Sequence, residues 1–285
     1  MNKKIALIAF DLDGTLALDD HKISKRTKDA IHALHNEGMH IVISTGRRFR
    51  SAQYVIDNLG LNVYCICNGG ALVKDEVQET ILNAAFSKEE FVDLISLARE
   101  HNLAIAGQRD AHTLGGSDFI IDNEIPWHEG IRTYFESNKN YATGSNLLED
   151  QQIDQENFLA LSTFDEMAKL KDFVNAVEKD ERFNVVVVSQ INGDAHYCEI
   201  TQRHVDKWYG LNHLSERFGL NPSNICAVGD ELNDVPMVKA AGLGVAMGNA
   251  HPELKSLADF ICGNHDEDGL LELFDYIRQY NSQCS

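Results

Sequence analysis

The chain has 285 residues, of which 44% are hydrophobic, enough for the core of one large domain or of two smaller ones. Asp and Glu number 44 against 25 Lys and Arg, and the formal net charge of -19 disfavours binding to nucleic acid or to an anionic membrane surface. No apolar run approaches the roughly 20 residues of a membrane span, and the N-terminal apolar run stops at Asp11 without a cleavage site. We therefore expect a cytoplasmic protein.

The 6 cysteines are scattered and form no C-x-x-C pair. Cys65 and Cys67 would share one face of a predicted strand, where a C-x-C site for a soft metal is one alternative. The favoured interpretation is that the cysteines are small buried apolar side chains in a reducing compartment.

Strands and helices alternate in the first part of the chain. "IALIAF" (5–10), "HIVIST" (40–45) and "VYCIC" (63–67) are continuous apolar runs, which is typical of parallel strands covered on both faces. Helices are predicted between them, one capped by Ser24 and stopped by Gly38, and one stopped by Gly60. This order of elements predicts a doubly wound parallel sheet.

The middle of the chain has a different order of elements. A helix begins at a Ser-x-x-Glu capping box, Ser87 with Glu90, and a second helix is predicted over 164–180. Strands are predicted near 103–108, 157–163, 184–189 and 196–201. The pattern predicts a separate α+β unit inserted into the first domain.

The last part returns to alternating elements. Helices are predicted over 207–219, 235–242, 248–258 and 266–280, the last capped by Asp268 or a neighbour, with strands over 224–229, 243–247 and 259–262. We therefore expect an α/β core made of 1–83 and 196–285, interrupted by an inserted domain over 84–195.

Polar residues gather at the predicted strand ends of the outer parts. In chain order they are Asp11 and Asp13, Thr45 and Gly46, Lys207 at the start of a helix, and Asp230, Asn233 and Asp234. Singly, each has an ordinary explanation as a turn, a surface lysine or a solvated acidic loop. In open α/β sheets, however, ligands bind at the carboxyl ends of the strands, so these segments would converge. Together they suit a hard divalent cation beside a phosphate held by a hydroxyl, backbone amides and a lysine.

Four of these segments resemble, in the same order, the four motifs of the haloacid dehalogenase superfamily. They are "DLDGT", "STGR", the isolated Lys207 and "GDELND". The inserted middle resembles the large α/β cap of the Cof-type branch, subfamily IIB, and further matches are "ICNGGALV", "VAMGNAHPELKSLAD" and "DEDGLLELF". Asp13 argues against dehalogenation, because the dehalogenase branch lacks the second aspartate of the first motif.

The resemblance implies a Mg²⁺-dependent phosphatase that acts through an aspartyl phosphate. Asp11 would be the nucleophile, Asp13 the general acid and then the general base, and Lys207 the group that neutralises nucleophile and phosphate. Mg²⁺ would be held by the side chains of Asp11 and Asp230 and by the backbone carbonyl of Asp13. Asp234 would orient its neighbours. The phosphate contacts implied are Leu12 through its amide, Thr45, Gly46, Lys207 and Asn233.

Other positions carry weaker indications. Arg47 and Asn68 follow predicted strands and are candidates for contact with substrate, although structural hydrogen bonding explains them nearly as well. "PWHEGIR" (126–132) is a candidate for sugar recognition, and a helix start is the favoured alternative. We expect a small phosphorylated metabolite, a sugar phosphate or a similar compound, as the substrate. The alternatives are a phosphotransferase or phosphomutase, and a non-catalytic regulator that binds phosphate or metal. The sequence indicates no oligomeric state.

Overall fold

The computed structural model describes residues 4–18, 20–192 and 195–284. The chain forms two compact units, of which unit 1 comprises the residues up to Leu82 and from Asp206 onward, and unit 2 runs from Asn83 to Val205. The expected boundary after residue 195 is corrected by strand β11 (Ala195–Gln202), which pairs with two strands of unit 2. The inserted unit therefore ends ten residues later than the sequence predicts, immediately before Asp206.

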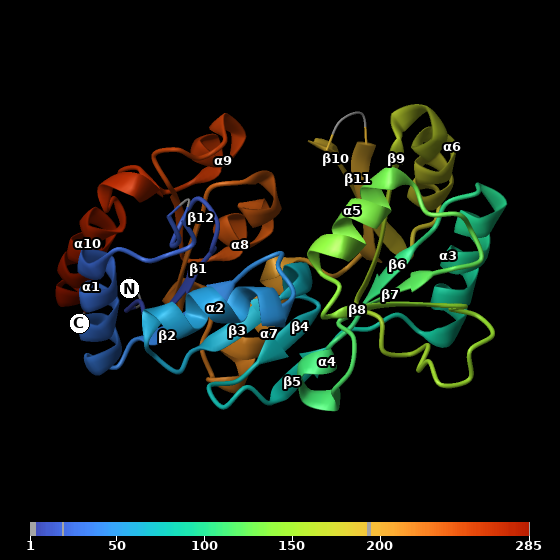
Figure 1. Ribbon diagram of the computed structural model, residues 1–285. Helices are drawn as coiled ribbons and strands as arrows, with labels where there is room; N and C mark the ends of the chain where they lie inside the picture. Colours follow the sequence, from blue (N-terminus) through green and yellow to red (C-terminus); the bar gives the residue numbers. More distant parts are fainter. Residues whose placement is uncertain (1–3, 19, 193–194, 285) are drawn as a thin grey trace. The chain divides into compact units, whose positions relative to one another are not determined.

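Unit 1 is built around an eight-stranded sheet in the order β14-β13-β12-β1-β2-β3-β4-β5 (Figure 1). Its strands are β1 (Leu7–Phe10), β2 (His40–Ser44), β3 (Tyr64–Cys67), β4 (Leu72–Lys74), β5 (Thr80–Asn83), β12 (Ile225–Gly229), β13 (Leu243–Ala246) and β14 (Phe260–Ile261). The strands from β14 to β3 are parallel to their neighbours, and β4 runs antiparallel to β3. The expected parallel α/β core is confirmed, and the short β4 and β5 are additions that the sequence did not predict.

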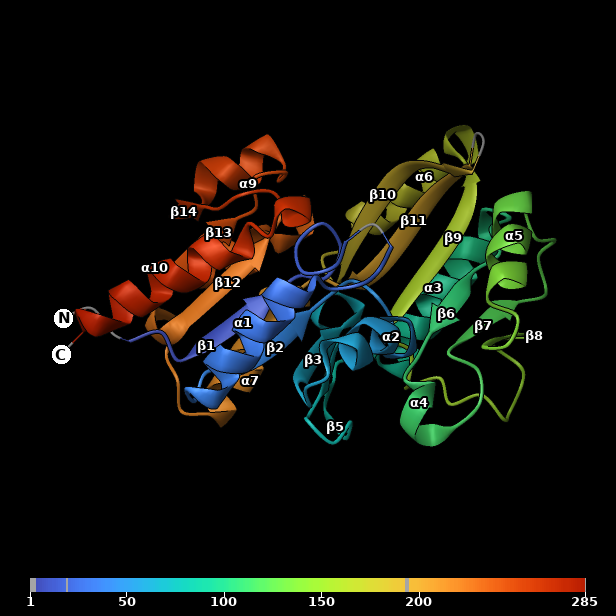
Figure 2. The ribbon, with the colours of Figure 1, turned by 60° about the vertical axis from the view of Figure 1, so that its left-hand side comes forward.

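Helices cover both faces of this sheet. They are α1 (Lys25–Asn36), α2 (Phe49–Leu59), α7 (Lys207–Arg217), α8 (Val235–Ala240), α9 (Pro252–Leu257) and α10 (Leu270–Ser282), with short 3-10 turns η1 (Asn68–Gly70), η2 (Pro222–Asn224), η3 (Leu232–Asp234) and η4 (His265–Glu267). α1 contacts α10, whereas α8 contacts both α7 and α9. Figure 2 shows α1, α2 and α10 in front of the sheet and α7 behind it. The sheet is therefore doubly wound, as expected.

The local signals of unit 1 explain these elements. All residues of β1 are buried, as a strand covered on both faces requires. Ser24 caps α1 by accepting a hydrogen bond from Thr27 N, and Gly60 ends α2 in the left-handed conformation. The N-cap of α10 is Gly269, a neighbour of Asp268, as one of the two alternatives had it. Asp268 itself accepts hydrogen bonds from the hydroxyl of Ser24 and from Arg26 Nη1, and so joins the end of the chain to α1.

Unit 2 contains a six-stranded sheet in the order β10-β11-β9-β6-β7-β8. The strands are β6 (Ala106–Gln108), β7 (Phe119–Asp122), β8 (Ala142–Ser145), β9 (Ala160–Glu166), β10 (Phe183–Asn192) and β11, and the helices are α3 (Lys88–Glu100), α4 (Ala111–Leu114), α5 (Glu129–Ser137) and α6 (Met167–Glu178). Neighbouring strands are antiparallel except for β7 and β8. The expected α+β insertion is confirmed.

Two hydrophobic clusters lie on opposite faces of the unit 2 sheet. One contains Phe91 of α3 and Phe173 of α6, and the other contains Ile131 of α5 and Phe164 of β9. The capping box of Ser87 and Glu90 is present at the start of α3. The helix predicted from Phe164 starts only at Met167, because Phe164 and its two successors extend β9.

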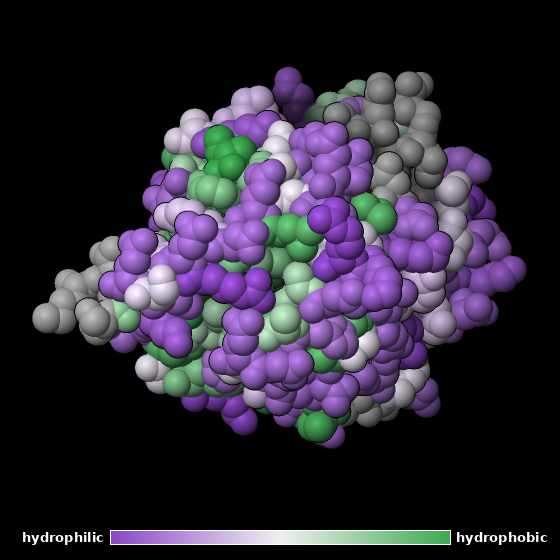
Figure 3. Space-filling view, turned by 90° about the vertical axis from the view of Figure 1, so that its left-hand side faces the viewer, coloured by the Kyte–Doolittle hydropathy of each residue, from purple (hydrophilic) through white to green (hydrophobic). Residues whose placement is uncertain are grey.

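Hydrophilic residues dominate the face of the molecule shown in Figure 3, and hydrophobic residues appear there in small separate areas. Within the part of the chain that the structure describes, no helix combines the length and the apolar character that crossing a membrane would need.

Candidate active site

The central strand β1 lies between β2 and β12, where the order of the strands reverses. Phe10 is paired with Ile43 on one side and with Val228 on the other, and Asp11 N donates a hydrogen bond to the carbonyl of Val228 at 2.9 Å. The residues that follow the three strands therefore leave the sheet at one edge. This is the position at which open α/β sheets bind ligands.

Lys207 is a fully buried lysine at the first position of α7. Its Nζ donates hydrogen bonds to Asp11 Oδ1 at 2.6 Å and to Asp234 Oδ1 at 2.5 Å. Burial alone would lower the pKa of Lys207, but the two carboxylates outweigh it and raise the pKa above its ordinary value. Lys207 therefore carries a positive charge between two buried carboxylates.

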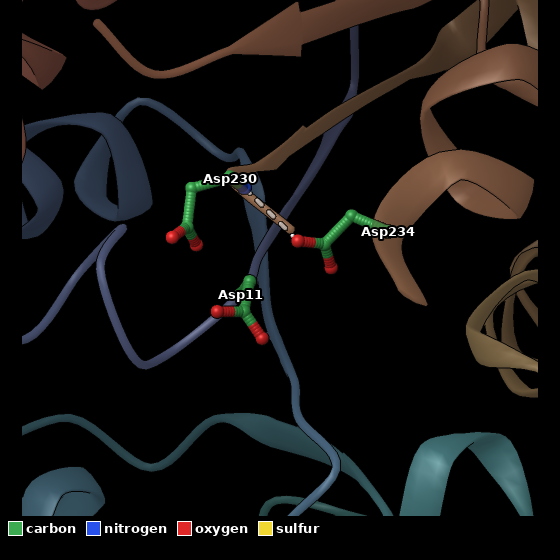
Figure 4. A group of neighbouring side chains, drawn as sticks. All are labelled: Asp11, Asp230 and Asp234. Carbon is green, nitrogen blue, oxygen red and sulfur yellow. Dashed lines mark hydrogen bonds between the residues drawn. The ribbon is translucent and has the colours of Figure 1, made fainter. Parts of the chain in front are cut away.

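Asp234 holds the loop after β12 in place. Its Oδ2 accepts hydrogen bonds from the backbone N–H groups of Asp230 and Glu231 at 2.9 and 3.0 Å, the first of which is the dashed line in Figure 4. Because its Oδ1 is bound by Lys207, both oxygens are engaged. Asp234 is thus placed to orient its neighbours, the role that the sequence analysis assigns to it.

The turn after β1 fits closely around Asp230. Thr15 Oγ1 donates to Asp230 Oδ1 at 3.0 Å. Gly14 has a φ of +72°, and a Cβ built on it would lie 2.2 Å from Asp230 Oδ2. Only glycine permits both this backbone conformation and this approach. Asn249 Nδ2 donates to the carbonyl of Gly14 at 2.8 Å and fixes the turn from the other side.

The carboxylates of Asp11, Asp230 and Asp234 each offer an oxygen within 4.8 Å of the others, and Figure 4 shows them turned toward a shared space. Burial raises the pKa of Asp11 to about 8, opposed by Lys207 and reinforced by the other carboxylates. Burial likewise raises the pKa of Asp230 to about 6. With Asp234 engaged, Asp11 and Asp230 remain to face a cation. Hard carboxylate oxygens beside excess negative charge fit Mg²⁺.

A cavity of about 270 Å³ opens beside this cluster. Its lining residues are Asp11, Asp13, Thr45, Gly46, Arg47, Glu231 and Asn233. Gly46 faces Asn233 across it, since a Cβ on Gly46 would lie 3.8 Å from Asn233 Nδ2. Most of the phosphate-binding residues named from the sequence therefore meet around one space, whose size suits a phosphate group.

Two further candidates, Leu12 and Asn68, do not line the cavity. The side chain of Leu12 is buried, and its carbonyl accepts hydrogen bonds from Leu16 N and Ala17 N, which closes the turn after β1. Asn68 is buried at the end of β3, where its N–H donates to the carbonyl of Arg47 at 3.0 Å. These contacts place Leu12 and Asn68 as supports of the loops that line the cavity.

Arg47 forms a two-point ion pair with Asp13. Arg47 Nε donates to Asp13 Oδ2 at 2.7 Å, and Nη2 donates to Asp13 Oδ1. Nη2 also donates to His21 Nδ1 at 3.1 Å, where the histidine nitrogen must accept because a guanidinium only donates. The candidate substrate residue thus holds the second aspartate of the first motif in a fixed orientation.

Sequence reasoning missed three features of the site. Glu231 lines the cavity although it stands between two residues that were named. The pairing of Arg47 with Asp13 joins residues 34 positions apart and has no local signal. The bond from Asn249 to Gly14 connects two recognised segments, "VAMGNAHPELKSLAD" and "DLDGT", but their contact is visible only in the fold.

Comparison with known proteins agrees with this arrangement. The model of the haloacid dehalogenase-like hydrolase family matches residues 8–274. The chain belongs to this family. The match covers both units, and it confirms the family expected from the four motifs.

Two curated relatives of the chain are named as phosphatases of Bacillus subtilis (strain 168). Phosphatase YwpJ is 28% identical over 290 residues, covering 95% of this chain and 99% of YwpJ. The 5-amino-6-(5-phospho-D-ribitylamino)uracil phosphatase YitU is 28% identical over 285 residues, covering 99% of this chain and 100% of YitU. The expectation of an enzyme of the phosphatase type within this family is thereby confirmed.

Among solved structures, the subclass IIB sugar phosphatase BT4131 superimposes with a TM-score of 0.73 at 21% identity, covering 97% of this chain and 99% of that one. This likeness shows that the two share a fold, including the inserted α+β unit expected of subclass IIB.

Proposed function

We propose that the protein is a Mg²⁺-dependent phosphatase of small phosphorylated metabolites that works through an aspartyl phosphate on Asp11. The observation that carries the proposal is the contact of buried Asp11 with Lys207 at 2.6 Å, beside Asp230 and at the wall of the cavity. A buried carboxylate that faces a cavity is a suitable nucleophile once nearby cations keep it ionised.

The residues around Asp11 would divide the reaction into two steps. In the first, a carboxylate oxygen of Asp11 forms a bond to phosphorus, the bond to the ester oxygen breaks, and Asp13 donates a proton to the departing alcohol. In the second, Asp13 takes a proton from water, whose oxygen displaces Asp11 and releases inorganic phosphate. Mg²⁺, held by Asp11, Asp230 and the carbonyl of Asp13, would supply positive charge to the phosphate oxygens.

The other residues would bind and orient the phosphate. Lys207 offsets the charge of Asp11 and of the phosphate from its buried position. The Thr45 hydroxyl, the Gly46 amide and the Asn233 side chain would donate hydrogen bonds across the cavity, whose walls they form. Arg47 would hold Asp13 toward the leaving group through its two-point contact.

Hydrolysis of p-nitrophenyl phosphate with and without Mg²⁺ tests the proposal. We expect turnover that requires Mg²⁺, that Asp11→Asn abolishes, and that yields inorganic phosphate as the product. Phosphate transferred to an added alcohol or sugar would indicate a phosphotransferase or phosphomutase. Binding of phosphate and metal without any turnover would indicate a regulator, and either result would overturn the proposal.

We also propose that unit 2 is a mobile cap that selects the substrate, and that the substrate is a sugar phosphate or a similar hydroxylated phosphate ester. The insertion of unit 2 between Thr45 and Lys207 in the chain supports this, as does the name of YitU, whose substrate carries a phosphorylated ribityl chain. Unit 2 also offers a polar cluster on its sheet, in which Gln108 donates to Glu199 at 3.1 Å.

A panel of phosphorylated metabolites tests the selective role of unit 2. Gln108→Ala should change the order of preference among sugar phosphates and leave p-nitrophenyl phosphate turnover nearly unchanged. An unchanged order would contradict the role of this cluster.

We place the enzyme in the cytoplasm. This proposal is supported by the free state of the cysteines, which are Cys65, Cys67, Cys198, Cys226, Cys262 and Cys284.

A further inference from the structure

The backbone of η1 touches the peptide that joins Asp206 to Lys207. Gly70, the last residue of η1, has a φ of +112°. A Cβ built on Gly70 would lie 1.8 Å from the carbonyl oxygen of Asp206 and 3.2 Å from Lys207 N. Since real Cβ atoms essentially never come within 3.0 Å of such atoms, the contact exists only because residue 70 has no side chain.

A second glycine, Gly210 of α7, closely approaches Gly70 and the end of β3. Gly210 lies three residues after Lys207 in α7, and a Cβ on Gly210 would lie 2.7 Å from Ile66 Cγ2 and 3.0 Å from the carbonyl oxygen of Gly70. Glycine is unfavourable inside a helix, so propensity does not explain it here. The close approach of α7 to the end of β3 does explain it. We call this contact between Gly70 and Gly210 the glycine contact.

The glycine contact stands at the start of the helix that carries the buried lysine. The chain leaves unit 2 at Val205, and Lys207 follows only two residues later. Asp206 caps α7 by accepting from Tyr209 N at 2.7 Å, a bond made within the helix itself. The glycine contact, in contrast, joins the first turn of α7 to β3 and η1. It thereby fixes the position of the Lys207 backbone relative to the sheet after which Asp11 lies.

We propose that Gly70 and Gly210 are positioning residues for phosphoryl transfer, because they set the place from which Lys207 reaches Asp11 and the phosphate. The inference rests on the proposed function. Displacing a catalytic group by about 1 Å costs about 100-fold in rate. A methyl group on Gly70 would displace the backbone of Asp206, and one on Gly210 would press on Ile66 and on the carbonyl of Gly70. Either change would shift the start of α7, and the ammonium group of Lys207 would move with it.

Gly210→Ala is the decisive variant. Alanine favours a helix more than glycine does, so a loss of activity could not be attributed to a weaker helix. We expect it to stay folded with kcat reduced about 10- to 100-fold, and Gly70→Ala to lose at least as much. Gly69→Ala is the matched control. Gly69 also has a positive φ, of +61°, but a Cβ there would meet nothing within 4 Å. We expect its kcat to stay within about threefold of wild type, since only backbone strain changes.

A second measurement separates positioning from general damage. Orthovanadate, which mimics the transferring phosphoryl group, should inhibit Gly210→Ala about 10- to 100-fold less strongly, in step with the loss in kcat. Mg²⁺ affinity should stay unchanged, because Asp11 and Asp230 directly follow β1 and β12, outside the glycine contact.

The outcomes distinguish the two proposals. A wild-type enzyme without phosphatase activity would refute the proposed function. If the wild type is active, the positioning role is overturned by a folded Gly210→Ala with wild-type kcat and vanadate inhibition, or by a Gly69→Ala that loses as much as Gly70→Ala. An unfolded Gly210→Ala would also overturn it, because the contact would then serve folding instead of the placement of Lys207.

Discussion

Each unit contains an ion pair with a buried carboxylate, and the two pairs are built differently. In unit 2, Arg99 donates to both oxygens of Asp122 at 2.8 Å. Arg99 also donates to Asn146 Oδ1 at 2.9 Å, and Asp122 accepts from Leu147 N at 3.3 Å. One positive charge meets one negative charge, and the remaining polar atoms find partners. This is the arrangement that a buried ion pair needs in order to be tolerated.

In unit 1 the charges do not balance. Lys207 is the ammonium group that contacts Asp11 and Asp234, and Asp230 lies within the same cluster. Three carboxylates and one ammonium leave an excess of two negative charges when all are ionised. A structural cluster would not retain such an excess, because burying unpaired charge is costly. The comparison indicates that unit 1 is arranged to receive positive charge, and that unit 2 is not.

The largest effect is expected at the nucleophile. Asp11→Asn should lower kcat by about 1000-fold or more, because an amide cannot take up the phosphoryl group. The thermal midpoint should stay the same or rise, since the amide carries no charge for burial to penalise and Lys207 keeps Asp234. Phosphate release and thermal unfolding measure the two effects. Substantial residual turnover by the pure variant would remove Asp11 from its role.

The equivalent change in unit 2 should have the opposite character. Asp122→Asn takes the partner charge away from Arg99, whose side chain is 21% exposed, and should lower the free energy of unfolding by about 1–3 kcal/mol. Turnover of p-nitrophenyl phosphate per folded molecule should change little. Chemical denaturation and activity assays below the transition give both quantities. If Asp122→Asn costs activity but not stability, the distinction between the two clusters fails.

Removing Asp230, the second carboxylate proposed to hold the metal, tests whether the excess charge receives a cation. Loss of a residue that only orients a metal ligand costs roughly 10- to 100-fold in metal affinity. Asp230→Ala removes a proposed direct ligand and should therefore weaken Mg²⁺ binding more than that. Ca²⁺ in excess should inhibit the wild type, because it accepts more ligands at looser geometry. Titration of the rate with Mg²⁺ measures the first effect, and the same titration in the presence of Ca²⁺ measures the second. An unchanged Mg²⁺ dependence in Asp230→Ala would contradict its assignment as a ligand.

Much of the unit 1 cluster could be predicted because Asp11 and Asp230 directly follow buried strands and Lys207 opens a helix, in segments that resemble the motifs of the family. Asp11, Asp230 and Lys207 needed only the rule that parallel strands end at one edge. The partner of Asp13 could not be predicted, since nothing local links it to Arg47. The glycine contact was equally hidden, because Gly70 and Gly210 look like a turn residue and a weak helix position until the fold brings them together.

Unit 2 could be predicted only in plan, for reasons visible in its residues. β8, with the sequence Ala-Thr-Gly-Ser, is half-exposed and has no apolar alternation. α5 is capped by His128, which accepts from Gly130 N, and histidine is not a usual helix cap. "PWHEGIR" contains the start of this helix, as the favoured alternative had it. The boundary at residue 196 was wrong because β11 continues the sheet of unit 2.

The ion pair of Arg47 and Asp13 is an intermediate case, with side chains 23% and 51% exposed. At this exposure the pair should contribute less than about 1 kcal/mol to stability. Arg47→Lys keeps the charge but loses the two-point geometry, so kcat should fall about tenfold while the thermal midpoint barely moves. Comparison of kcat with KM for p-nitrophenyl phosphate measures the effect. A rise in KM alone would assign Arg47 to substrate binding instead of to Asp13.

The smallest effect concerns the pH dependence of Mg²⁺ binding, and it follows from the excess charge itself. Burial raises the pKa of Asp11 to about 8 and that of Asp230 to about 6, so without metal Asp11 is largely protonated near neutral pH. Mg²⁺ binds the ionised carboxylates, and protons therefore compete with it. Because the competitor is removed as pH rises, the affinity should increase between about pH 6 and 8, by less than about tenfold per pH unit. It should level off above the pKa of Asp11.

Calorimetry in two buffers of different ionisation enthalpy measures the proton released on binding. An affinity that stays flat from pH 6 to 8, with no proton released, would mean that the carboxylates are already ionised before Mg²⁺ binds.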